Sequence, residues 1–205
     1  MSDPSPPDPF PSVPSDALAE GGWRERERRE TTEFDAAVVT VEAATVVYED
    51  RALRDRIREA TGFDRLWRFF VASRLTVSPA TGPSPALTKL VANRAHAGFA
   101  DTIADRGFEG VRRADPDDDG AAEDALDDGS RVAGYEALCR LDGVAVRARG
   151  WAAVRPVGDA YLLVGGAYPT AVRSAPDERT DDALAEAFDP DGFRDELFSL
   201  LRATE

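Results

Sequence analysis

Hydrophobic and polar residues alternate most clearly along three stretches in the second half of the chain. In residues 131–141, 144–154 and 160–168, every second position is apolar or small. A period of two is typical of a β-strand that buries one of its faces. Only two residues separate each stretch from the next, and such short connections are typical of antiparallel hairpins. The pattern therefore predicts three consecutive antiparallel strands.

The turn at Asp142-Gly143 sets the register of the first hairpin, because this residue pair favours a type I′ turn. The register places Leu141 opposite Val144, Cys139 opposite Val146 and Ala137 opposite Ala148 on an apolar face. On the other face, Leu138 lies opposite Arg147, Glu136 opposite Arg149 and Gly134 opposite Trp151. On the apolar face, apolar residues thus lie opposite one another, and on the other face Glu136 lies opposite a residue of opposite charge, Arg149, as cross-strand pairing favours.

The first half of the chain alternates between strand and helix patterns. Residues 23–34 mix charges and lead into a valine-rich stretch at 35–50, which predicts one bent strand or two short ones. Apolar periodicity and capping residues predict helices at about 51–60, 84–106 and after Asp189-Pro190. A long strand is predicted at about 65–79. "GFEGV" (107–111) leads into an acidic loop at 115–129.

This order of elements predicts an α+β fold with an antiparallel β-sheet and helices packed mainly on one face. Residues 1–22 contain many prolines and no apolar core segment, which predicts a disordered, acidic tail. Residues 23–205 are then a single domain. The tail lacks the apolar segment of a signal peptide or membrane anchor, so we expect a cytoplasmic protein.

Charge narrows the choice of partners. The chain has 39 acidic and 25 basic residues, a formal net charge of −14, and Lys89 as its only lysine. This acidity disfavours nucleic acids and anionic membranes as partners. It also keeps a protein soluble at molar salt, and we interpret the chain as salt-adapted (halophilic).

Gly165 and Gly166 interrupt the last strand and suggest a phosphate-binding loop. Such a loop requires a helix directly after its glycines, whereas a proline and a polar loop follow here. If the chain turns back at Gly158-Asp159, Trp151 lies between Gly134 and Gly166. We interpret the glycines as making room for the Trp151 ring, with ligand contact as the alternative.

Several motifs that suggest catalysis or metal binding are incomplete. Residues 115–126 fit the first half of a calcium-binding EF-hand loop, but Leu126 stands where a bidentate glutamate is required. Cys139 is the only cysteine and lies on an apolar strand face, where we expect an inert thiol. His96 is expected on the solvated side of its helix. We therefore assign no catalytic residue, no metal site and no cofactor.

The remaining candidate site is a sheet face that carries arginine beside tryptophan. Arg147, Arg149, Trp151 and Glu136 share this face, and Arg74 and Arg68 join it if the strand at 65–79 belongs to the same sheet. Arginine beside an aromatic ring is suited to binding carboxylate or phosphate groups. The alternative is an ordinary solvated face of paired charges.

Four stretches, "VVYEDRALRDRIREATG", "WRFFVASRLTVSP", "FADTIADRGFEGV" and "GWAAV…YLLVGGAYP", resemble an uncharacterised family of haloarchaeal proteins. The resemblance covers most of residues 34–170. It implies a salt-adapted cytoplasmic protein and no known activity, cofactor or catalytic residue. The order of elements is also similar to that of PsbP/Mog1-type folds, a likeness of topology that says little about function.

Two main functional hypotheses follow, and a third possibility is a purely structural or interaction protein with no small ligand. The first is a non-enzymatic domain that binds a partner protein or a small anionic ligand through Arg74, Arg147, Arg149, Trp151 and Glu136. The second is an enzyme that uses carboxylate and arginine chemistry on a small substrate. A concave site with perturbed carboxylates would favour the enzyme, and a flat arginine-rich sheet would favour the binding domain.

The charge balance generates a first prediction. Repulsion within a chain of net charge −14 destabilises the folded state at low ionic strength, and salt screens this repulsion. Melting temperature, measured by circular dichroism, should rise by several degrees between about 0.1 and 2 M KCl, where the Debye length shrinks several-fold. A melting temperature that does not respond to KCl would contradict the interpretation of salt adaptation.

Overall fold

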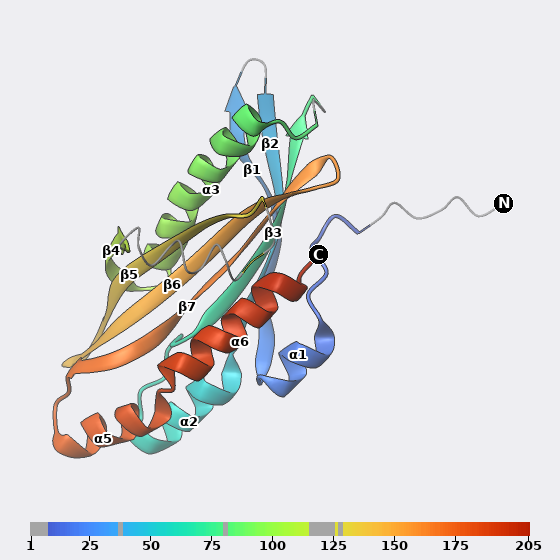
Figure 1. Ribbon diagram of the computed structural model, residues 1–205. Coiled ribbons are helices and arrows are strands. Elements are labelled where there is room, and N and C mark those ends of the chain that lie inside the picture. The colour runs from blue at the N-terminus through green and yellow to red at the C-terminus, as the bar shows by residue number, and fades with distance from the viewer. Residues whose placement is uncertain (1–7, 37–38, 80–81, 115–125, 127–128) are drawn as a thin grey trace.

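The computed structural model describes residues 8–36, 39–79, 82–114, 126 and 129–205 (Figure 1). Its seven strands form one antiparallel sheet in the order β1-β2-β3-β7-β6-β5-β4. The strands are β1 (Trp23–Ala36), β2 (Val39–Asp50), β3 (Phe69–Ser78), β4 (Phe108–Arg113), β5 (Arg131–Leu141), β6 (Val144–Val157) and β7 (Ala160–Ser174). The helices are α1 (Ser15–Glu20), α2 (Arg51–Thr61), α3 (Pro85–Asp105), α5 (Glu178–Ala187) and α6 (Pro190–Ala203). The predicted α+β class and antiparallel sheet are confirmed.

The structure confirms the register predicted for the β5–β6 hairpin. Cys139 pairs with Val146, Glu136 with Arg149, and Leu141 with Val144. Asp142 and Gly143 both have positive φ angles, of 40° and 86°, as a type I′ turn requires. The local turn chemistry and the apolar face therefore sufficed to place these two strands.

The capping residues also behave as their sequence positions predict. The side chains of Asp50, Ser84 and Asp189 each accept a hydrogen bond from a backbone N–H in the first turn of α2, α3 and α6. Gly62 ends α2 with a φ of 82°, in the left-handed region that favours glycine. The boundaries of these three helices were therefore well predicted.

Trp151 does lie opposite both Gly134 and Gly166, but the explanation of the glycines was wrong. A Cβ atom added to Gly166 would lie 2.5 Å from the carbonyl oxygen of Phe69 and 2.8 Å from the side chain of Leu197. A Cβ added to Gly165 would lie 2.7 Å from the ring of Phe99. The glycines therefore let two helices approach β7, and the indole of Trp151 occupies neither position.

Because successive strand residues point to opposite faces, these contacts place two helices on opposite sides of the sheet. Phe99 belongs to α3 and Leu197 belongs to α6. On the side of α6, α2 packs against α5, and these three helices lie together in Figure 1. The helices that gather mainly on one face are thus α2, α5 and α6, and α3 covers part of the other face.

Four described elements differ from the sequence-based expectations, which did not include β1, β4, α1 or the helix α5. Residues 23–36 form a complete edge strand, β1, and β4 is a second edge strand within what we expected to be a lead into the acidic loop. Charged residues suit edge strands, which must avoid pairing with other chains, and they conceal the apolar alternation used for prediction.

The segment 8–22 belongs to the predicted disordered tail, yet it contains α1 and two backbone contacts with the C-terminus. Ser12 donates to the carbonyl oxygen of Glu205 at 2.6 Å, and Glu205 donates back to Ser12 at 2.9 Å. Residues 1–7 of the predicted tail lie outside the described residues. These contacts join part of the predicted tail to the C-terminal end of the chain.

The glycine contacts generate the second prediction. Gly165→Ala and Gly166→Ala should each lower the free energy of unfolding by about 1–3 kcal/mol, because neither Cβ fits without moving backbone or a packed ring. Gly98→Ala is the control, since nothing lies within 4 Å of its added Cβ. That change in helix α3 should stabilise the protein by up to about 1 kcal/mol. Urea unfolding measures all three, and a neutral Gly166→Ala would contradict the close approach of α6.

Candidate functional site

Strands β4, β5 and β6 place one glutamate between two arginines, one on each neighbouring strand. Arg112 pairs with Glu136 across β4 and β5, and Glu136 pairs with Arg149 across β5 and β6. Arg149 Nη1 lies 3.7 Å from Glu136 Oε1, and Arg112 Nη2 donates a hydrogen bond to Glu136 Oε2. Strands that lie side by side thus hold the carboxylate between two guanidinium groups.

The ring of Trp151 contacts Arg149 and a further arginine, Arg194 on α6. The guanidinium carbon of Arg149 lies 5.4 Å from the centre of the Trp151 ring, and that of Arg194 on α6 lies 5.8 Å from it. Cation–π attraction at these distances restrains both side chains. We refer to Arg112, Arg147, Arg149 and Arg194, together with Glu136, as the arginine cluster. Arg147 lies two residues before Arg149, on the same face of β6, and is exposed.

The ring of Trp151 is itself covered. It is only 2% exposed, and the ring of Phe198 on α6 meets it edge-on at 5.5 Å between centroids. Its Nε1 donates to the hydroxyl of Tyr168 at 3.3 Å. Burial raises the pKa of Tyr168, although that hydrogen bond and the nearby arginines oppose the rise. Trp151 therefore supports the arginine cluster from beneath and does not offer an open stacking surface.

Arg74 and Arg68 share this face of the sheet, as the sequence suggested, but both lie apart from the arginine cluster. Arg74 pairs with Leu162 of β7 and is four residues along β3 from Phe70, which faces Gly166. Phe70, Gly166 and Trp151 lie side by side across β3, β7 and β6. At the rise of a β-strand, four residues place Arg74 roughly 13 Å along the strands from these three residues. Arg68 is 2% exposed and bonds to Asp50, Glu196 and the carbonyl oxygen of Phe193. Arg74 is thus separate from the cluster, and Arg68 is part of the core.

The sequence missed two members of the cluster, for identifiable reasons. Arg112 lies on β4, which was not predicted to be a strand, so its position opposite Glu136 could not be inferred. Arg194 lies on α6, and no sequence pattern indicates which strand that helix covers. Hydrophobic periodicity placed Phe193 and Leu197 toward the core. The one available signal for Arg194 was its position directly after Phe193, at the edge of the buried side of the helix.

His96 is buried, which contradicts the expectation of a surface histidine. Its Nε2 lies 3.1 Å from the carbonyl oxygen of Arg131, and its Nδ1 lies 3.2 Å from the hydroxyl of Tyr135. Burial, aided by the charge of Arg113, lowers the pKa of His96 to about 4. The face of α3 that contacts the sheet is rotated relative to the expected apolar stripe, so that Leu90 is exposed and His96 is buried. The neutral histidine fills that face and joins α3 to β5.

Cys139 is buried as predicted, and burial raises the pKa of its thiol. Such a thiol stays protonated and unreactive at neutral pH. Among the described residues, no group of three His, Cys, Asp or Glu side chains could hold a metal ion. The calcium-loop motif, at residues 115–126, lies outside the described residues except for Leu126, which is buried.

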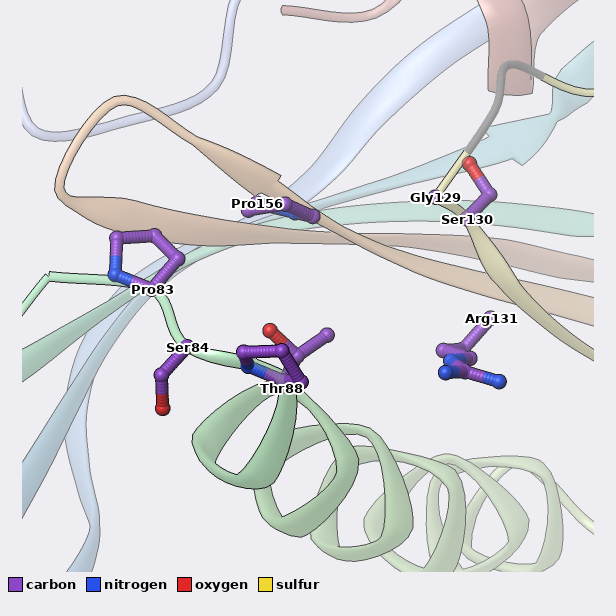
Figure 2. Close-up of a pocket in the computed structure, with 8 residues that line it drawn as sticks. Pro83, Ser84, Thr88, Gly129, Ser130, Arg131 and Pro156 are labelled. Atoms are coloured by element: carbon purple, nitrogen blue, oxygen red, sulfur yellow. The ribbon is translucent and has the colours of Figure 1, made fainter.

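Two hollows of the described surface lie away from the arginine cluster. One, of about 530 Å³, is found between the start of α3 and the start of β5 (Figure 2). The other, of about 560 Å³, lies between α1, β1 and α2. No residue of the arginine cluster lines either of these two hollows.

Comparison with known proteins places the chain in a family without assigning it an activity. No curated protein and no solved structure matches it. None of the helices that the structure describes is both long and apolar enough to cross a lipid bilayer. Residues 10–205 match a family described as a domain of unknown function, DUF6517, and the chain belongs to that family.

Proposed function

We propose that this protein is a salt-adapted, cytoplasmic, non-enzymatic binding domain whose arginine cluster binds carboxylate groups of an acidic partner protein. The observation that carries the proposal is the position of the Glu136 carboxylate between Arg112 and Arg149. The cluster already holds a carboxylate of its own chain. A carboxylate supplied by a partner would meet the same donors, together with those of Arg147 and Arg194.

Arginine suits this role because its planar guanidinium donates two parallel hydrogen bonds to one carboxylate. Trp151 restrains Arg149 and Arg194 before any partner arrives, which reduces the entropy that binding must remove. The side chain of Arg149 is 26% exposed and that of Arg112 is 71% exposed, so both remain within reach. The net charge of −14 repels an acidic partner from most of the surface, so such a partner would dock where four arginines make the local charge positive.

A protein partner is favoured over a small molecule because Arg112 and Arg147 of the cluster are exposed and neither of the two hollows includes a residue of the cluster. Small ligands bind in concave sites that cover most of their surface. An acidic segment can instead spread several carboxylates over an exposed patch and gain from each of them. The same exposure favours a binding domain over an enzyme.

The third prediction tests this proposal with a fluorescently labelled octaglutamate peptide at about 0.1 M KCl, where charge pairs are only partly screened. Arg147→Gln should weaken binding about five- to tenfold, as loss of roughly 1 kcal/mol implies. Glu136→Gln should tighten binding by about three- to tenfold, because the peptide no longer competes with an internal carboxylate. Fluorescence anisotropy measures both dissociation constants.

Matched controls on α3, which covers the opposite face of the sheet, separate a specific cluster from a general change of charge. Arg94→Gln and Asp101→Asn alter the same charges at exposed positions and should leave binding within about twofold of wild type. Equal effects of Glu136→Gln and Asp101→Asn would mean that the cluster is an ordinary set of surface ion pairs. Competition by citrate as strong as that by unlabelled peptide would point to a small ligand.

A further inference from the structure

Part of the sheet face beside α6 carries no described helix. α6 packs along β7, and its Phe198 covers Trp151 on β6. Among the described helices, α3 is the one that packs substantially on β4 and β5, and it lies on the opposite face. Alternate residues of a strand share a face, so the uncovered surface can be read from the register. Its side chains include Arg112, Arg140, Arg147, Arg149 and the half-buried Leu138.

Helix α5 carries the opposite charge on its exposed side. Its ten residues include four carboxylates and one arginine. The carboxylates are those of Glu178, Asp181, Asp182 and Glu186. All four are exposed, and none makes an ion pair or side-chain hydrogen bond with a residue that the structure describes. On the neighbouring helix α2, by contrast, Asp55 is paired with Arg51 at 3.1 Å and with Arg58 at 3.0 Å.

The exposed side of α5 also has a shape that suits the uncovered surface. Asp181, Asp182 and Ala185 lie along one side of the helix, because they are three and four residues apart. Ala185 is small and exposed, so another surface can approach the helix closely at this point. On the sheet, Leu138 lies directly across from Arg147. An alanine against this leucine leaves the carboxylates beside it within reach of the surrounding arginines.

Both surfaces lie on the same side of the molecule. α5 packs on α2 and on β7, among the helices that gather on the α6 side of the sheet (Figure 1). The arginine cluster faces that side as well. Two copies that face each other across a two-fold axis can therefore place α5 of each on the uncovered sheet surface of the other. The contact is made twice, and the dimer is closed because each copy uses both of its surfaces.

We propose that the acidic partner is a second copy of this chain, an inference that rests on the proposed function because the arginine cluster receives the carboxylates. In the dimer, α5 of each copy docks on the arginine cluster of the other. Two copies of net charge −14 repel each other at long range. At about 1 M KCl the Debye length is about 3 Å, which screens this repulsion more than it screens charge pairs in direct contact.

Sedimentation equilibrium of the full chain at about 1 M KCl, where the long-range repulsion is screened, measures the dissociation constant of the dimer. Arg147→Glu and Asp182→Arg should each weaken the dimer by about thirtyfold or more, because the symmetry repeats each repulsive contact twice. An equimolar mixture of the two variants should dimerise again, to within about threefold of wild type. In the mixed dimer the exchanged charges meet at one contact and the wild-type charges meet at the other, so both contacts are attractive.

Matched charge reversals on α3 show whether the position of the charge matters. Arg94→Glu and Asp101→Arg lie on the opposite face and should change the dissociation constant by less than about twofold. The proposal is overturned if wild type stays monomeric at about 1 mM, where even weak association is visible, or if the mixture does not restore the dimer. Either result leaves the proposed function in place if octaglutamate still binds and its binding still depends on Arg147. A wild type that binds no peptide would instead contradict the proposed function, and the dimer with it.

Discussion

The structure depends on one buried guanidinium, that of Arg68. This side chain is 2% exposed, and it donates to Glu196 at 2.6 Å, to Asp50 at 3.2 Å and to the carbonyl oxygen of Phe193 at 3.0 Å. The rings of Trp23 and Phe193 each lie 4.6 Å from it. A buried charge is tolerated only when paired and fully hydrogen-bonded, and removing one partner of such a pair typically costs about 3–5 kcal/mol. The start of β1, the cap of α2 and the first half of α6 must therefore meet at this point.

The position of α6 in turn determines which part of the sheet is open. Once Arg68 holds the first half of the helix, Leu197 packs over Gly166 and Phe198 covers Trp151. Arg155 on β6 holds the other end through the carbonyl oxygen of Leu201, at 3.0 Å. The helix thus buries the tryptophan and leaves the neighbouring arginines of β4 and β6 accessible. The proposed binding surface is the part of this face beside α6.

The sequence predicted what is decided locally and missed what is decided by distant contacts. Asp142-Gly143 fixed the β5–β6 register, and with it the Glu136–Arg149 pair at the centre of the candidate site. Alternation also placed Arg68 with the surface arginines, because its acidic partner Glu196 lies 128 positions away and no local pattern signals it. The same limit explains the buried His96, whose partners belong to β5. Edge strand β1 was missed because its charges conceal the period of a strand.

Arg68 couples α2 to α6 and so fixes the helix that covers Trp151. This coupling can be measured by hydrogen–deuterium exchange of Arg68→Met against wild type, with Arg58→Met, at an exposed arginine of α2, as the control. In Arg68→Met, exchange should accelerate together in the first turn of α2 and throughout α6, while α3 on the opposite face keeps its wild-type protection. Unchanged protection of α6 in Arg68→Met, or an equal loss of protection in α3, would contradict it.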